Sequence, residues 1–191
     1  IRHCSPTLAG IKTGNMFSHP YGSIKEMRSD IRCLNKTLSA KGVCVIPLRY
    51  NGKSALIYIY RPSMLSKDLQ NKTAYNILSK CGYGICSQAG CVAQLMKRMA
   101  ACKEFPHEVG LFLGYPPDDV KGFIENNRGG CKCVGYWKVY GDVKSAVKTF
   151  GKYKKCTQVY AEQYAEGKTV ERLTRYKIDT RRKAKTLLFG E

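Results

Sequence analysis

The feature that most constrains the fold is a hairpin signal in the first third of the chain. Two apolar runs rich in β-branched and aromatic residues, 43–50 and 54–60, are joined through Asn51-Gly52. An Asn-Gly pair between such runs is typical of a tight turn, because both residues tolerate a positive φ. The sequence therefore predicts two adjacent antiparallel strands.

Helical patterns surround this hairpin. Ser23, with Glu26 three residues later, forms a capping box at the start of a helix that ends at Gly42. The apolar face expected for that helix consists of Ile24, Met27, Ile31 and Leu34. Further helices are expected at about residue 6 and over 62–82, 87–102 and 117–126, and another should begin at Asp142.

Two later segments predict further strands. Residues 109–113 form a short apolar run, and residues 132–140 alternate between two faces. The expected fold class is therefore α+β, with a mixed or antiparallel sheet of about four strands and helices mostly on one face. No linker divides the chain, so we expect one domain over 1–180, followed by a basic C-terminal tail over 181–191.

The charge and the cysteine content limit the classes of partner and the cellular compartment to be expected. The chain of 191 residues has 33 Lys and Arg against 14 Asp and Glu, a net charge of +19, and a field of this sign attracts acidic proteins, nucleic acids and anionic membranes. No run of about 18 apolar residues is present, so no membrane span is expected. Ten cysteines without a secretory signal predict a cytoplasmic protein with reduced thiols.

Three motifs carry a resemblance to a known family. They are CSPTLAGIKTG over 4–14, HEVGLFLGYPPDDVKGFIEN over 107–126 and GYWKVYGD over 135–142. Together they resemble an uncharacterised bacterial family, a domain of unknown function common in anaerobes. The resemblance implies a single-domain cytosolic protein and supplies no catalytic residue and no cofactor, so the cofactor is left unknown. It favours an acidic redox carrier such as a flavodoxin as the partner.

Cys4 is the candidate reactive group. It directly precedes an expected helix start and neighbours Arg2 and His3, and positive charge and a helix N-terminus both stabilise a thiolate. The alternative is a thiol that simply packs beneath the helix entry.

Cys131 and Cys133 are the candidate metal ligands. On a strand both would face one side, but neither zinc nor iron–sulfur spacing is matched, so they count as ligands only if a metal is found. Buried thiols are the alternative. The adjacent Asp118 and Asp119 are explained by the acidic preference of a helix start rather than by catalysis.

The candidate binding residues combine cations with aromatic rings. On the expected strand, Lys132, Tyr136, Lys138 and Tyr140 share a face with Trp137 behind them, and such a platform can stack bases or a flavin ring and pair phosphates. Lys12 and Tyr115 complete the set. The alternative is an ordinary solvated sheet face.

Three functions remain open at this point. The first is an accessory protein that docks an acidic partner, such as a flavodoxin, through its Lys and Tyr surface. The second is a small thiol-dependent or cofactor-using redox enzyme with Cys4 as its reactive group. The third is a non-specific nucleic-acid binder, although no helix-turn-helix, RNA-recognition or zinc-finger signature is present.

Overall fold

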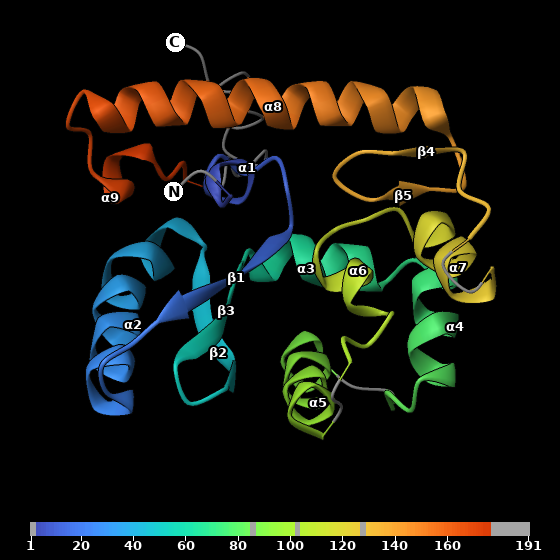
Figure 1. Cartoon of the computed structure of the whole chain (residues 1–191), viewed down its shortest axis with the longest axis horizontal. Helices are drawn as coiled ribbons and strands as arrows, with labels where there is room; N and C mark the ends of the chain where they lie inside the picture. Colours follow the sequence, from blue (N-terminus) through green and yellow to red (C-terminus); the bar gives the residue numbers. More distant parts are fainter. Residues whose placement is uncertain (1–2, 85–86, 102–103, 127–128, 177–191) are drawn as a thin grey trace, which may run out of the picture.

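The hairpin around Asn51 supplies two strands of a three-stranded antiparallel sheet in the computed structural model (Figure 1). The structure describes residues 3–84, 87–101, 104–126 and 129–176. β2 (Cys44–Tyr50) and β1 (Gly14–Pro20) pair with opposite edges of β3 (Ser54–Tyr60). The turn is closed by Asn51, whose side-chain oxygen accepts the Ser54 N–H at 2.8 Å, and by Gly52 at φ +86°. The predicted hairpin is confirmed.

β3 separates two hydrophobic cores because it lies in the middle of the sheet, and a third, smaller cluster around Trp137 lies between residues 133–139 and residues 143–153. Tyr58 and Tyr60 face one core, and Ala55, Ile57 and Ile59 face the other. This alternation is what a period of two residues requires when both faces of a strand are covered.

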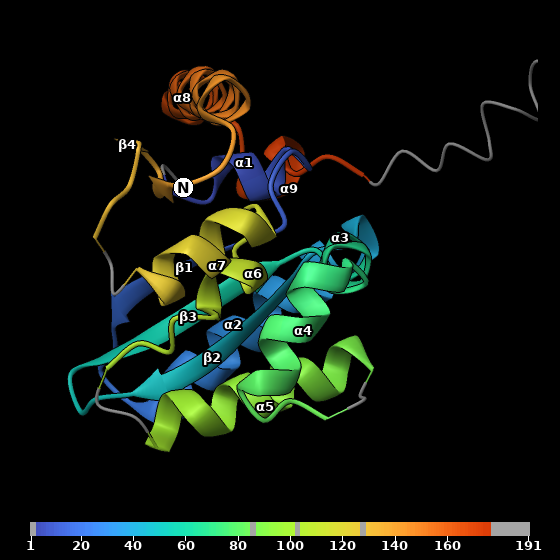
Figure 2. The ribbon, with the colours of Figure 1, turned by 90° about the vertical axis from the view of Figure 1, so that its right-hand side faces the viewer.

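Each face of the sheet has its own helices (Figure 2). The first core is covered by α3 (Pro62–Leu69), α4 (Lys72–Lys80), α5 (Gln88–Ala101), α6 (Val109–Phe112) and α7 (Pro117–Glu125). The second is covered by α1 (Ser5–Leu8), α2 (Ile24–Leu38), α8 (Val143–Ala165) and α9 (Val170–Leu173), with the short 3-10 helix η1 (Ser39–Lys41) after α2. The predicted α+β domain is confirmed, but helices lie on both faces of the sheet rather than mostly on one.

The capping box of α2 forms as expected. The Ser23 hydroxyl accepts the Glu26 N–H at 3.1 Å, and Met27 and Ile31 are buried. Ile24 and Leu34 are exposed, so the buried stripe of α2 is narrower than the sequence pattern indicated.

The strand predicted over 109–113 is wrong, because this segment forms the helical turn α6. The Leu113 N–H donates to the carbonyl of Val109, and the turn ends at Gly114 with φ +75°. A buried apolar run of five residues fits a helical turn as well as a strand, and periodicity alone does not distinguish them.

The single strand predicted over 132–140 is also wrong. It is a small hairpin of β4 (Cys133–Val134) and β5 (Lys138–Val139), separate from the main sheet. The chain reverses at Gly135, where a Cβ atom would lie 2.2 Å from the Phe150 ring of α8. Only glycine lets the turn approach α8 this closely, and a glycine inside an alternating pattern is a signal for such a bend.

α8 is a 23-residue helix that lies along one side of the molecule, over α1, α9 and the β4–β5 hairpin (Figures 1 and 2). The Asp142 side chain caps its start by accepting the Ser145 N–H at 3.1 Å. Ala146 is buried, whereas Val147 is exposed. The predicted tail over 181–191 lies outside the described residues. Within the described ranges, no helix is both long enough and apolar enough to cross a membrane.

Arg61 connects the two ends of the chain to the sheet. It follows β3 directly and is buried, and its guanidinium donates to four backbone carbonyls. The acceptors are Thr7 at 2.7 Å, Leu8 at 2.7 Å, Arg175 at 2.8 Å and Lys41 at 3.1 Å. The planar fork of donors suits this arrangement, since a guanidinium can address several acceptors at fixed angles.

We expect Arg61→Met to lower the free energy of unfolding by about 3 kcal/mol, because it leaves buried carbonyls without donors. Urea denaturation followed by circular dichroism measures this loss. Arg28→Met on the exposed side of α2 is the control and should stay within about 0.5 kcal/mol of the wild type. Equal midpoints for the two variants would contradict the role given to Arg61.

Candidate functional site

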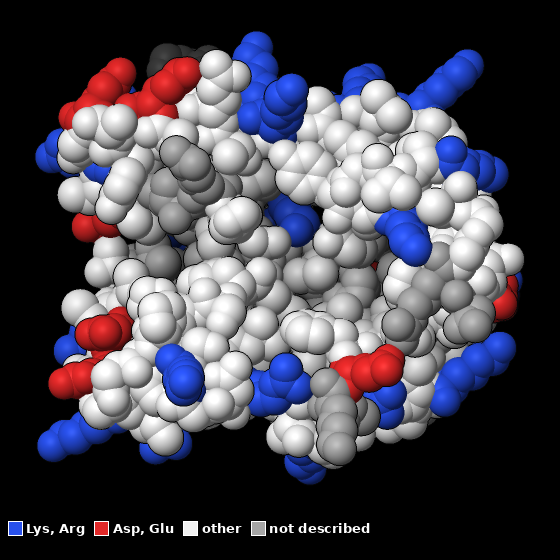
Figure 3. All heavy atoms as spheres, in the orientation of Figure 1, with Lys and Arg blue, Asp and Glu red and all other residues white. Residues whose placement is uncertain are grey.

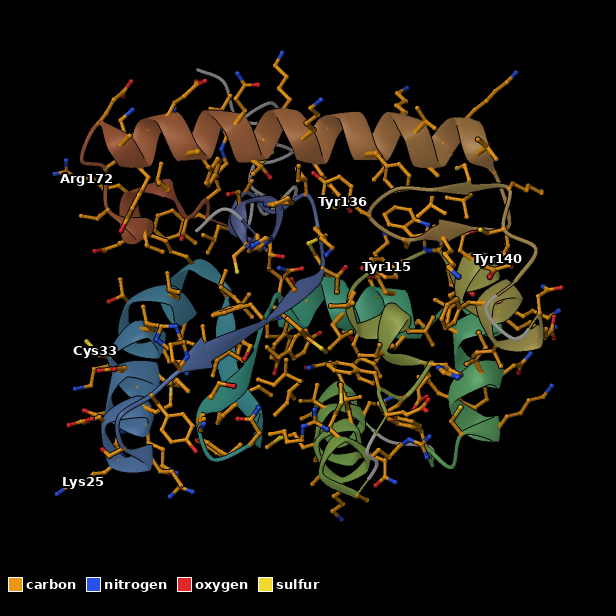
Figure 4. All side chains as sticks on the ribbon, in the orientation of Figure 1. Lys25, Cys33, Tyr115, Tyr136, Tyr140 and Arg172 are labelled. Atoms are coloured by element: carbon orange, nitrogen blue, oxygen red, sulfur yellow. The ribbon has the colours of Figure 1, made fainter. Side chains whose placement is uncertain are left out.

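Aromatic side chains gather where the β4–β5 hairpin meets α7 and α8. We call this group the aromatic junction, and it consists of Tyr115, Tyr136, Trp137, Phe150 and Tyr153. The ring centroids of Tyr115 and Trp137 are 4.9 Å apart and nearly stacked, and those of Trp137 and Phe150 are 4.6 Å apart and edge-on. Figure 4 shows Tyr115 and Tyr136 toward the middle of the molecule below α8, with Tyr140 beside α7. These spacings are typical of favourable aromatic pairs.

Asp119 fixes the hairpin to the start of α7. Its carboxylate is buried, and one oxygen accepts the Trp137 indole N–H at 2.7 Å. The other oxygen accepts the backbone N–H groups of Tyr140 at 2.8 Å and Gly141 at 2.7 Å. The Asp119 carboxylate therefore joins α7 to the β4–β5 hairpin and holds Trp137 in one orientation.

The two adjacent aspartates do different work. Asp118 is exposed at the first turn of α7, in accord with the helix-start explanation, but Asp119 binds the hairpin as well. The acidic pattern at the helix start did not indicate this role. The available signal was the single Trp, since a buried indole N–H needs an acceptor.

Lys12 lies against the Tyr115 ring of the junction. It is 5% exposed, its ammonium donates to the Asn15 side-chain oxygen at 3.0 Å, and it lies 5.4 Å from the centroid of the Tyr115 ring. Burial lowers the pKa of Lys12 to about 8, and the charge of Cys4 raises it by a smaller amount. Lys12 and Tyr115, both predicted as binding residues, are thus in contact.

Cys4 is buried beside Lys12 at the start of α1. Burial raises the pKa of the Cys4 thiol, and a hydrogen bond to Asn15 and the charge of Lys12 oppose this with smaller effects. The expected stabilisation of a thiolate is therefore outweighed, and the neutral thiol is favoured. A reactive role for Cys4 stays a prediction.

The platform predicted on the 132–140 strand is not one face. Lys132 is exposed and its ammonium donates to the Gly141 carbonyl at 3.0 Å, whereas Tyr136 lies in the turn and belongs to the junction. The Tyr140 ring packs against Gly122, where a Cβ atom would lie 2.5 Å from it. The reversal at Gly135 folds the segment back on itself, so Lys132 lies beside the Tyr140–Gly141 end of the hairpin and Tyr136 lies at the turn, rather than all of them along one strand.

The two candidate metal ligands lie at the start of the hairpin. Cys133 is in β4 and Cys131 precedes that strand, and both are free thiols of intermediate burial. Over the residues that the structure describes, no group of three or more His, Cys, Asp or Glu side chains could hold a metal ion.

Three predicted binding residues do meet in one cavity. Tyr115, Trp137 and Lys138 line a cavity of about 190 Å³ together with His107, Val109 and Phe123. The Lys138 ammonium lies 5.9 Å from the centroid of the Phe123 ring, and the His107 ring meets the same ring edge-on at 5.4 Å. We call this space the hairpin cavity.

A buried ion pair was not anticipated from the sequence. Glu108 is 2% exposed and accepts from the Arg98 Nε at 2.6 Å and from the Tyr83 hydroxyl at 3.2 Å. Burial and the neighbouring carboxylate of Glu108 raise the pKa of Tyr83. The available sequence signal for this pair was the acidic Glu108 directly before the apolar segment 109–113. The pair fixes α6 to α5, and thereby positions one wall of the hairpin cavity.

We expect Asp119→Asn to release the hairpin. An amide has one acceptor oxygen instead of two, so its NH2 group must face either the Trp137 N–H or the backbone N–H groups of Tyr140 and Gly141, and the free energy of unfolding should fall by about 2 kcal/mol. Because Trp137 is the only Trp, its emission should shift to longer wavelength as it becomes solvated. Asp118→Asn on the exposed neighbour is the matched control, and unchanged emission in both variants would contradict this role for Asp119.

We expect the burial of Lys12 to make stability depend on pH. The unfolded chain keeps this proton up to about pH 10.5 and the folded chain only to about 8, so the unfolded state binds more protons between these values and the free energy of unfolding rises with pH. A pKa difference of this size corresponds to roughly 3 kcal/mol. Lys12→Met should therefore be more stable than the wild type at pH 7, and the gap should close by pH 10.5.

Urea denaturation at several pH values measures this gap. The exposed Lys25→Met on α2 is the control, and its curve should stay parallel to that of the wild type (Figure 4). A Lys12→Met curve that is also parallel would show that the amine is not held in a costly environment.

Comparison with known proteins agrees with the three motifs. Comparisons with curated proteins and with solved structures each gave no match. The sequence matches the family described as "Protein of unknown function (DUF3793)" over residues 1–174, which confirms the resemblance to a family of unknown function. The chain therefore belongs to the DUF3793 family.

Proposed function

We propose that the protein is a binding protein that docks an acidic protein surface through the outer face of α8. The observation that carries this proposal is a row of lysines on that helix. Lys144, Lys148, Lys152 and Lys155 are all exposed, and they lie opposite the buried Ala146, Tyr153 and Tyr160. The row extends for about 16 Å at 1.5 Å per residue.

No described carboxylate forms an ion pair with these four lysines. α8 has no acidic residue between its cap, Asp142, and Glu162. In Figure 3, Lys and Arg side chains project along the side where α8 lies, and Asp and Glu gather near its C-terminal end. The surface field over most of α8 is therefore positive.

Apart from the Asp142 cap, the charges are not arranged to stabilise the helix itself. The first turn of α8 contains no acid and the last turn no base, although the helix dipole favours both. Lysines four residues apart repel each other by a few tenths of a kcal/mol per pair. A row that weakens its own helix is better explained by an external partner than by solubility.

The composition of the row favours a protein over a nucleic acid. α8 contains no Arg, which is the residue that pairs phosphates with two parallel hydrogen bonds. The row also presents no aromatic ring between its lysines on which bases could stack. Hydrated point charges on an exposed helix suit fast and salt-sensitive encounters with an acidic protein, such as a redox carrier of the flavodoxin type.

The test compares two variants with the same loss of charge. The first is Lys144→Gln, Lys148→Gln and Lys152→Gln on α8, and the second is Lys25→Gln, Arg28→Gln and Arg32→Gln on the exposed side of α2. Association with an acidic flavodoxin should be measured by stopped flow. The ionic strength should be about 0.01 M, because the Debye length is then about 30 Å and charge effects are little screened. The α8 variant should associate about 10-fold more slowly than the wild type.

The α2 variant should stay within about 2-fold of the wild type. Equal losses in both variants would mean that only net charge matters, and the docking face would be abandoned. Tighter retention of single-stranded DNA than of the acidic protein, lost in the α8 variant, would assign the row to nucleic acid instead.

A further inference from the structure

The main sheet has two edges, and the β1 edge is open over the residues that the structure describes. β1 pairs with β3 without a register shift, and no described strand or helix runs along its other side. In Figure 1, β1 lies in front of β3. An open edge presents unpaired N–H and C=O groups, which can pair with a strand of another chain.

The hydrogen bonds at the two ends of β1 show which of its residues face outward. The Thr13 carbonyl, just before β1, accepts the N–H that follows β3, and the Tyr21 N–H, just after β1, donates to the carbonyl that precedes β3. An antiparallel ladder alternates between residues that bond to the partner strand and residues that face away from it. The odd-numbered residues of β1 therefore bond to β3, and the backbone groups of Met16 and Ser18 point to the open side.

The opposite edge of the sheet, β2, is closed. The side-chain amide of Asn35 on α2 donates to the Val45 carbonyl at 2.7 Å and accepts the Val45 N–H at 2.9 Å. Pro47 has no N–H to offer, and the register with β3 shifts just after it. A covering helix, a proline and a bulge are devices that keep an edge strand from pairing with another chain.

β1 has almost none of this protection. It contains no Lys or Arg, although the chain has 33 of them, and its one proline is Pro20 at the very end. Ser18 and His19 are exposed, and the apolar side chains of Met16 and Phe17 are only half-buried. Another strand on this edge would bind the free backbone groups and cover both apolar side chains.

The charge of β1 indicates which strand fits. An acidic strand would meet no cation on β1, because β1 contains no charged residue apart from the titratable His19. A second β1 is equally uncharged and offers the same free groups. Two such edges are complementary when a two-fold axis relates them, since each residue pair then occurs twice.

We propose that β1 pairs antiparallel with β1 of a second copy of the chain, so that the two sheets join into one. Met16 of each copy lies opposite Ser18 of the other, and each of these pairs exchanges two hydrogen bonds. The two Phe17 residues lie opposite each other on the axis, in the closely spaced kind of pair in which aromatic side chains interact favourably. This contact goes beyond the docking proposed for α8, and neither depends on the other.

The salt dependence of this dimer should be opposite to that of the docking on α8. Each chain has a net charge of +19, so two copies repel each other until salt screens the charge. Sedimentation velocity of the full-length chain, with a reductant that keeps the cysteines as thiols, measures the dimer. We expect a Kd on the order of 10–100 μM in about 0.5 M salt, and dimerisation at least about 10-fold weaker in about 0.01 M salt.

Ser18→Pro should weaken the dimer at least about 10-fold. It removes an N–H that points away from β3, and it gives β1 the feature that Pro47 gives β2, so the fold of each chain should persist. Circular dichroism checks the fold. A second variant, Ser18→Lys, keeps the N–H and should weaken the dimer about 5-fold through charge at the edge. Its matched control is Ser29→Lys on the exposed side of α2, which adds the same charge and should dimerise nearly as the wild type does.

Four results would overturn the proposal. They are a chain that stays monomeric at about 300 μM in about 0.5 M salt, a dimer that weakens as salt is added, unchanged dimerisation in folded Ser18→Pro, and equal losses in Ser18→Lys and Ser29→Lys. Binding of the acidic flavodoxin that is lost in Ser18→Pro would assign the edge to that partner instead. The α8 variant, which has three fewer positive charges, should dimerise at least as well as the wild type, so the two proposals can fail separately.

Discussion

The guanidinium of Arg61 is the interaction on which the arrangement of the chain depends. It is placed at the end of the central strand, and it holds carbonyl groups from α1, from η1 and from the segment after α9 at one point. Hydrophobic packing brings these segments together without fixing their angles, whereas hydrogen bonds to a planar cation do fix them. The short helices α1 and α9 can therefore close part of the second core although each buries little surface.

Asp119, with the opposite charge, likewise fixes separate segments of the chain to each other. It holds backbone N–H groups and one indole instead of carbonyls, and so it joins a hairpin of only two residues per strand to α7. An isolated hairpin of this size is not stable in water. The few hydrogen bonds between β4 and β5 cannot hold the hairpin in place, and the buried carboxylate of Asp119 adds the stabilisation that they lack. The aromatic junction and the hairpin cavity both depend on this contact. Arg61 and Asp119 carry opposite charges, and backbone groups supply most of the hydrogen-bond partners of each. Neither side chain therefore needs a charged partner.

The local elements were readable from the sequence, and the contacts between distant segments were not. Asn51-Gly52 and the Ser23 capping box predicted their turn and their helix start, because both signals act within four residues. Residues 109–113 and 132–140 were misread, since a short apolar run has no unique period and Gly135 turns the chain where alternation suggested that it continues. Of the predicted binding residues, Lys12 and Tyr115 lie in contact, and Tyr115, Trp137 and Lys138 line one cavity, while their binding of a ligand stays a prediction. Their roles depend on Asp119, Glu108 and Asn15, whose partners lie far away along the chain or are seen only once burial is known.

The pairing of the two ends of the domain has a consequence for how the chain folds during synthesis. The Arg175 N–H donates to the Leu8 carbonyl at 3.0 Å, and the Arg175 carbonyl completes the acceptors around Arg61. Until residue 175 has left the ribosome, α1 therefore lacks its neighbour and the cation at the end of β3 lacks one of its ligands. The first core, which is built from residues 44–124, can collapse while translation continues. The second core includes Tyr160 of α8 and Leu173 of α9, so among the described residues it is complete only after α9 has been synthesised.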